Sequence, residues 1–204
     1  MSQLTVRGSL FLITAAVLFL AGCNESVSNI DTTNDEGKAV LGLDYRDFDQ
    51  AAAKMVQSMI ASGAFDKSGG GRYVVAVSSI KNDTMQRIDT SQLMAKIEQE
   101  LLNSGRVVMT SAVGTETDAL VHESRQLRES DEFDQSTVAA RGQMIAPELS
   151  ISGKIIQRNI RYDSNKQQVE YYFQLSLADI TSGLRLWQNE EVIGKRGSNR
   201  LTSW

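Results

Sequence analysis

The spacing of hydrophobic positions predicts an amphipathic helix near residue 50. Apolar side chains recur at three- and four-residue steps from Phe48 to Ile60, which is the spacing of one helix face. Asp47 and Gln50 have the spacing of a capping box at its start, and Gly63 can end it. We therefore expect a helix that packs one apolar stripe against a core.

A second apolar stripe, from Leu93 to Leu102, predicts another helix, for which Asp89 is the expected cap. Two short runs rich in β-branched residues flank it, Tyr73–Val77 and Arg106–Ser111. Such runs are typical of buried strands, and we expect the first to be covered on both faces.

The middle of the chain is predicted to hold two more helices around an acidic loop. The helices are expected over Thr115–Arg128 and Thr137–Ile145, with Pro147 following the second. The segment Glu129–Asp134 reads as a solvated loop.

Strict alternation of apolar and polar residues over residues 169–177 is the clearest strand pattern in the chain. Leu149–Tyr162 and Leu184–Gly194 are expected as the strands on either side of it, joined by turns at residues 163–166 and 181–183. The predicted fold class is α/β, a mixed sheet of about four to five strands with a C-terminal antiparallel meander and helices packed on it.

The first residues are typical of an export signal. Arg7 precedes an eleven-residue apolar run, Leu10–Leu20, which as a helix would span about 16 Å, roughly half of a bilayer core. That length suits the apolar part of a signal peptide rather than a membrane span. An ordinary signal peptide or a buried helix with an incidental cysteine is the alternative.

The four residues Leu20-Ala21-Gly22-Cys23 resemble the bacterial lipobox, after which the cysteine becomes the lipidated N-terminus. Cys23 is the one cysteine of the chain, so we expect it to be a lipid attachment point rather than a catalyst or half of a disulfide. The expected division is a signal peptide over 1–22, the lipidated cysteine and a flexible tether over 23–43, and an α/β domain over 44–204. The family rule for lipoprotein sorting implies that Asn24 favours the outer membrane.

Charge and motif content exclude several classes of function. Removal of residues 1–22 leaves 20 basic and 25 acidic residues, which gives no basic stripe for nucleic acid. The glycines of the segment 69–71 precede a strand and so do not form a phosphate loop. His122, the single histidine, has no triad partner at a recognisable spacing. We predict no catalytic residue, no metal site and no cofactor, hence no enzyme.

The C-terminal hairpin carries a family resemblance. Residues 179–187 (DITSGLRLW) look like the strand–turn–strand hairpin of the penicillin-binding-protein activator LpoB family. Residues 73–84 (YVVAVSSIKNDT) are similar to the first strand of that family and its exit loop, and 89–111 and 44–59 resemble the adjoining elements. The resemblance implies a fold like the N-terminal domain of TolB. It also implies an outer-membrane lipoprotein on the periplasmic face that binds and activates a bifunctional class A penicillin-binding protein and so regulates peptidoglycan synthesis.

Aromatic and arginine side chains facing solvent on a sheet are the usual anchors of a protein partner. The candidates for contact with the synthase are Arg158, Tyr162, Tyr172, Arg185 and Trp187. For each of them the alternative is an ordinary structural role, such as packing under a helix.

Two other functions stay open at this point. One is a structural or secretion lipoprotein on the same scaffold, related to the curli-secretion lipoprotein family. That role needs a membrane-inserting segment, for which Leu149–Leu177 is the one candidate. The other is a cell-wall hydrolase, which needs an acidic or histidine-based site.

Overall fold

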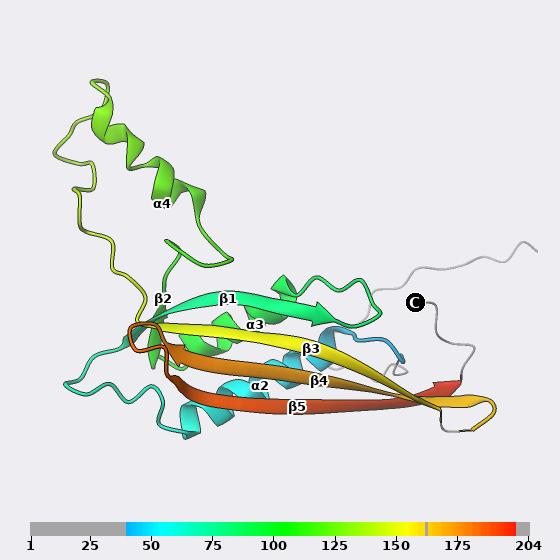
Figure 1. Cartoon of the computed structure of the whole chain (residues 1–204). Helices are drawn as coiled ribbons and strands as arrows, with labels where there is room; N and C mark the ends of the chain where they lie inside the picture. The colour runs from blue at the N-terminus through cyan, green and yellow to red at the C-terminus, as the bar shows by residue number, and fades with distance from the viewer. Residues whose placement is uncertain (1–39, 162, 199–204) are drawn as a thin grey trace, which may run out of the picture. The chain divides into compact units, whose positions relative to one another are not determined.

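The computed structural model describes residues 40–161 and 163–198, and its five strands form one sheet (Figure 1). The strand order is β2-β1-β3-β4-β5. β1 is parallel to both β2 and β3, whereas β3, β4 and β5 form an antiparallel meander. The predicted mixed sheet is thus confirmed. The strands are β1 (Tyr73–Asp83), β2 (Val107–Met109), β3 (Leu149–Arg161), β4 (Lys166–Asp179) and β5 (Arg185–Ser198).

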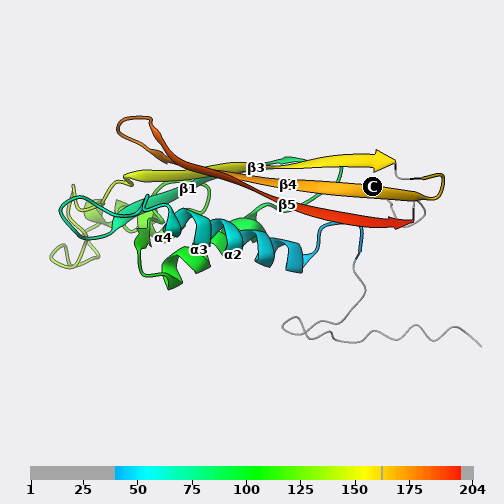
Figure 2. The ribbon, with the colours of Figure 1, turned by 90° about the horizontal axis from the view of Figure 1, so that it is seen from below.

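Two helices, α2 (Tyr45–Ala61) and α3 (Ser91–Asn103), lie against the same face of the sheet (Figure 2). The alternating residues of β4 account for this arrangement. Val169, Tyr171 and Phe173 are fully buried beneath the helices, and the ring of Phe48 meets that of Phe173 edge-on at 6.1 Å between centroids. The inner face of the sheet is therefore the core, and none of the described long helices lies on the opposite face.

Both helix caps differ from prediction by a few residues. The cap of α2 is Asp44, whose Oδ1 accepts from the Arg46 amide at 3.0 Å. Asp47 occupies the third helical position and accepts from the Asp44 amide at 2.8 Å, so the capping box starts three residues earlier than predicted. In α3 the N-terminal flanking residue is Thr90, although Asp89 still accepts from the amide of Ser91.

Residues 41–43 are packed onto the domain rather than free of it. Leu41 is buried, and its carbonyl accepts a hydrogen bond from the Tyr171 hydroxyl at 3.0 Å. Gln86 accepts from the Leu43 amide at 3.1 Å, and Lys195 donates to the Gly42 carbonyl at 2.7 Å. These contacts fix the leading segment, residues 41–43, beside the end of β5.

The two helices predicted over Thr115–Arg128 and Thr137–Ile145 are wrong. The first region contains only the short helix α4 (Ala119–Glu123) and the 3₁₀ turn η2 (Gln126–Glu129), and the second contains no helix. The reason is packing: Leu120, expected on an apolar helix face, is 68% exposed. Without a surface to cover, so short a helix gains little stability.

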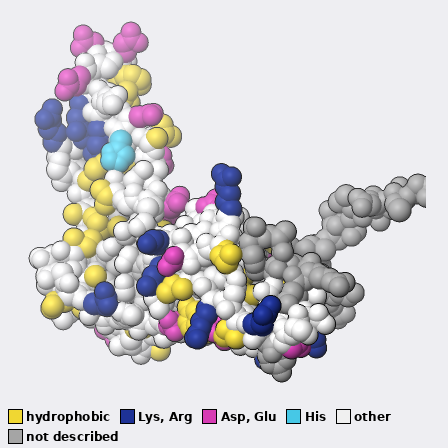
Figure 3. All heavy atoms as spheres, turned by 45° about the vertical axis from the view of Figure 1, so that its right-hand side comes forward, with side chains coloured by type: hydrophobic (Ala, Val, Ile, Leu, Met, Phe, Trp, Pro, Cys, Tyr) yellow, Lys and Arg dark blue, Asp and Glu magenta, His cyan; other side chains and the backbone are white. Residues whose placement is uncertain are grey.

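Residues 116–146 form an arm that projects from the sheet (Figure 1). Its own polar contacts hold its two limbs together, because Arg128 donates to the carbonyls of Ala139 and Ala140 and Gln135 donates to that of Leu127. Figure 3 shows acidic side chains at the far end of the arm and apolar side chains nearer its base. Among the large apolar side chains exposed on the arm are Leu120, Phe133 and Ile145.

Candidate partner interface

The face of the sheet opposite α2 and α3 is the candidate site, and strand register decides which side chains it presents. Tyr172 alternates with the buried residues of β4 and therefore points outward. Ile156 of β3 and Val192 of β5 lie at the positions paired with it. We call this surface the open face. Its polar outward positions include Ser152, Lys154, Arg158, Gln168, Glu170, Tyr172, Gln174, Ser176, Gln188, Glu190 and Arg196.

A chain of hydrogen bonds organises the half of the open face nearest the β3–β4 turn. Glu170 Oε2 accepts from the Tyr172 hydroxyl at 2.6 Å, and its Oε1 accepts from Gln168 Nε2 at 2.7 Å. Gln168 Oε1 in turn accepts from Arg196 Nη2 at 2.7 Å. Arg158 occupies the register position opposite Glu170. The network holds the tyrosine ring in one orientation before any partner arrives.

The protonation equilibria of this network follow from its contacts. Hydrogen bonds from Tyr172 and Gln168, aided by the charge of Arg158, hold the pKa of the Glu170 carboxyl below its usual value. The same carboxylate raises the pKa of the Tyr172 hydroxyl. Glu170 is therefore ionised and Tyr172 neutral at physiological pH, as a hydroxyl donor to a carboxylate requires.

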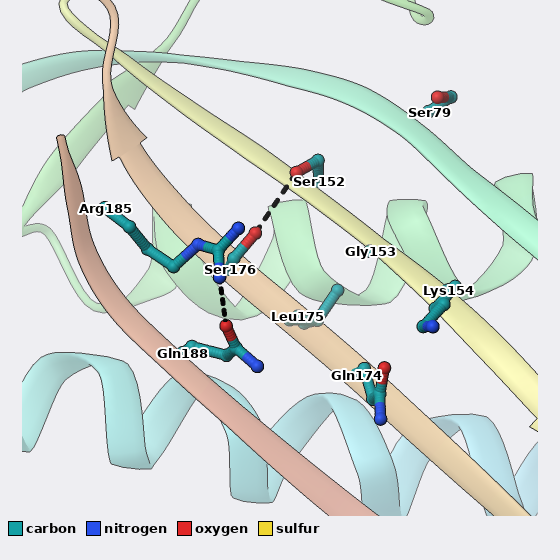
Figure 4. Close-up of a pocket in the computed structure, with 9 residues that line it drawn as sticks. All are labelled: Ser79, Ser152, Gly153, Lys154, Gln174, Leu175, Ser176, Arg185 and Gln188. Carbon is teal, nitrogen blue, oxygen red and sulfur yellow. Dashed lines mark hydrogen bonds between the residues drawn. The ribbon is translucent and has the colours of Figure 1, made fainter. Parts of the chain in front are cut away.

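A hollow of about 440 Å³ occupies the other half of the open face (Figure 4). The hydroxyls of Ser152 and Ser176 lie 3.2 Å apart on its floor. Arg185 Nη1 donates to Gln188 Oε1 at 2.5 Å, which fixes the guanidinium across one side. The lining residues are Ser79, Ser152, Gly153, Lys154, Gln174, Leu175, Ser176, Arg185 and Gln188.

The structure describes four of the five predicted partner residues and places them at three different positions. Arg158 and Tyr172 lie together on the open face, and Arg185 lies at the hollow. Trp187, in contrast, is only 9% exposed and belongs to the core on the helix side, so the expectation that it faces solvent is wrong. The bulge between Leu177 and Ala178 places its neighbours out of simple alternation. Tyr162 lies outside the described residues.

Sequence reasoning missed Lys154, Gln174 and the two serines of the hollow. The sequence does indicate that they face outward, because each alternates with a buried residue on its strand. Polar side chains at such positions, however, are indistinguishable from ordinary solvent-facing residues. Only the register between β3, β4 and β5 brings them together.

Within residues 40–161 and 163–198, no three or more histidine, cysteine or acidic side chains come together as a metal site. His122 Nε2 lies 2.8 Å from the Ala112 carbonyl oxygen, which gives it a structural contact at the base of the arm. None of the described helices has the length and apolar character needed to cross a bilayer. Cys23 and the predicted signal peptide lie outside the described residues.

Three solved structures illustrate what the chain is similar to. The C-terminal domain of LpoB from Salmonella enterica is 13% identical, with a TM-score of 0.42, over 72% of this chain and 98% of that one. The same domain from Escherichia coli is 14% identical, with a TM-score of 0.41, over 73% and 99%. Lipoprotein GNA1162 from Neisseria meningitidis is 13% identical, with a TM-score of 0.38, over 64% and 87%.

The family assignment comes from the sequence rather than from these distant likenesses. A comparison with curated protein sequences gives no match. The family model described as peptidoglycan-synthase activator LpoB matches residues 47–193, which include nearly all of α2, the whole of α3 and nearly the whole sheet. The chain therefore belongs to the LpoB family of peptidoglycan-synthase activators.

Proposed function

We propose that this chain is an outer-membrane lipoprotein that binds a bifunctional class A penicillin-binding protein and activates its synthesis of peptidoglycan. The observation that carries the proposal is the family match over residues 47–193, because it spans the elements that build the open face. In this proposal Cys23 bears the lipid that fixes the protein to the periplasmic face of the membrane, and the domain itself performs no chemistry.

The open face supplies suitable contacts for such a partner. Tyr172 offers a large amphipathic ring whose orientation is set by Glu170, and Arg158 offers a cation beside it. Pre-ordered aromatic and arginine side chains lose little entropy on binding and dominate many protein interfaces. Activation then means tighter binding to the active conformation of the synthase than to the inactive one, and it cannot exceed that difference in affinity.

The secretion-lipoprotein alternative gains no support from the fold. Residues 149–161 and 166–177 lie in β3 and β4, and their inward side chains, among them Ile151, Ile155 and Phe173, are fully buried in the domain core. The segment that would have to enter a membrane is thus committed to packing against α2 and α3.

The test uses the full-length protein, purified in detergent and titrated against each class A synthase of the same organism. We expect one synthase to bind with a measurable dissociation constant and to polymerise glycan faster in the complex. Replacing both Arg158 and Tyr172 by Ala should weaken binding at least tenfold, as expected for loss of two interface anchors. Lys96→Ala, on the exposed side of α3, is the matched control and should bind like wild type. If no synthase binds, the proposal is wrong.

A further inference from the structure

Two lysines face each other on the open face, and neither has an acidic partner among the described residues. Lys81 of β1 and Lys154 of β3 occupy register-paired positions on neighbouring strands. Among the described residues, no carboxylate lies within ion-pair distance of either ammonium group. Like charges directly opposite each other weaken a sheet, so the fold gains nothing from this pair. An anion bound beside them would remove the repulsion.

Lys154 also lines the hollow, and Arg185 adds a second cation at its other side (Figure 4). The hydrogen bond to Gln188 engages only one of the guanidinium nitrogens, so the group keeps donors for a carboxylate. The hollow therefore presents two cations, on β3 and β5, across a floor formed by β4.

The rest of the lining identifies the kind of ligand. Among the described residues, it consists mainly of serine hydroxyls and glutamine amides, and Leu175, which also lines it, is a buried core residue. No aromatic residue of the described chain lines the hollow, so the described lining lacks the anchors that dominate protein–protein interfaces. Its volume lies within the range of small-molecule sites. Each serine hydroxyl can donate one hydrogen bond and accept two, which leaves capacity beyond the Ser152–Ser176 contact.

We propose that the hollow binds an anionic saccharide, with its carboxylate held between Lys154 and Arg185 and its hydroxyl and acetamido groups paired with the serines and glutamines. A disaccharide-peptide of the cell wall is the ligand that fits this chemistry, because it combines amino sugars with free carboxylates. This identification rests on the proposed function, which brings the protein to the wall. The saccharide site occupies a different half of the open face from Arg158 and Tyr172.

Calorimetric titration of the full-length protein in detergent tests the proposal. The probes are a soluble disaccharide-peptide with free carboxylates, the same compound with methyl-esterified carboxylates, a neutral N-acetylglucosamine oligomer and inorganic phosphate. We expect saturable binding of the first and at least tenfold weaker binding of the other three. The double variant Lys154→Gln with Arg185→Gln should also bind the first probe at least tenfold more weakly. Lys96→Gln, on the helix side, should leave that affinity unchanged.

Three results would overturn the saccharide site. They are equal affinity for the free and esterified compounds, binding of phosphate as tightly as the saccharide, and wild-type affinity in the double variant. Because Lys154 and Arg185 are exposed, the double variant should keep its thermal unfolding temperature, which separates loss of binding from loss of folding. Synthase binding is measured independently. A protein that binds its synthase but no saccharide contradicts this inference alone, whereas one that binds the saccharide but no synthase contradicts the proposed function.

Discussion

Lys195 Nζ lies 2.5 Å from Asp47 Oδ2, and both side chains are only about 10% exposed. The contact joins the inner side of β5 to the first turn of α2. The same ammonium group donates to the Gly42 carbonyl, so a single lysine holds the sheet, the helix start and the leading segment together. Further along β5, Glu191 pairs with Lys54 and Asn189 donates to Ser58, and both partners lie on α2.

Removal of this buried lysine should therefore be costly. Lys195→Met leaves Asp47 charged and nearly buried, and we expect it to lower the free energy of unfolding by about 3 kcal/mol. Lys96→Met breaks the half-exposed pair with Asp49 and should cost less than about 1 kcal/mol. Urea denaturation of both variants measures the difference. Equal losses would show that the buried pair does not fix the helix to β5.

Alkaline pH should destabilise the domain through Tyr171. Burial raises the pKa of its hydroxyl from 10.0 to about 12. The folded state holds this proton more tightly than the unfolded chain, so stability is complete below pH 10 and falls as the pH rises toward 12. The loss should reach about 2–3 kcal/mol. Denaturation of wild type and Tyr171→Phe between pH 8 and 12 tests this, because the variant should lack that component of the decline. Parallel curves would contradict the assignment.

Gly153 should tolerate no side chain. A Cβ atom there would overlap the Gln174 carbonyl oxygen and lie 2.6 Å from a methyl group of Leu175. Gly153→Ala must therefore push β3 from β4 or displace a core leucine, and we expect a loss of about 2 kcal/mol or more in the free energy of unfolding. Gly194→Ala is the matched control, because nothing lies within 4 Å of its added Cβ. Thermal denaturation of both variants compares their stabilities. A Gly153→Ala protein as stable as wild type would contradict the predicted overlap.

The arm should be dispensable for folding. The arm leaves the sheet where the Thr115 amide donates a hydrogen bond to the Val77 carbonyl. It returns where the Glu148 amide donates to the Val74 carbonyl. These carbonyls are three residues apart on β1, about 10 Å, so a linker of roughly six residues can join the ends. Replacing residues 117–146 by a Gly/Ser linker should change the free energy of unfolding by less than about 1 kcal/mol. Loss of cooperative unfolding would show instead that the arm supports the sheet.

The predicted lipid attachment has a direct test in cells. Cys23→Ala should move the protein from the membrane fraction to the soluble fraction, because the acyl chains supply the anchoring free energy. Cell fractionation with immunoblotting measures the distribution. Ser26→Ala, three residues further along, is the control and should remain with the membranes. Continued membrane association of the Cys23 variant would refute the lipobox interpretation.

The sequence predicted those elements whose hydrophobic period matches a buried face. The alternation around Phe173 and the helical steps around Met55 both correspond to side chains that the core covers completely. The prediction failed for the arm, where Leu120 and Val121 suggest a helix face but no described part of the chain buries it. Local pattern does not reveal whether a partner element is present.

The candidate site was predictable in part for the same reason. Arg158 and Tyr172 could be placed on a sheet face from alternation alone. Trp187 is buried because it is register-paired with buried Leu177 on the inner face, and the hollow depends on the register of three strands; local spacing determines neither pairing. Lys154 is recognised as a candidate only from the structure, which places it opposite Lys81 and at the hollow.

The leading segment and the arm lie at opposite ends of the long strands. Leu41 packs beside Gly197 at the C-terminal end of β5, whereas the arm leaves the domain close to the Asp179–Leu184 turn, at the opposite end of the same long strands. Fourteen residues of strand separate these ends by about 45 Å. Any force applied at residue 41 would thus act at one end of these strands, and the arm lies at the other end.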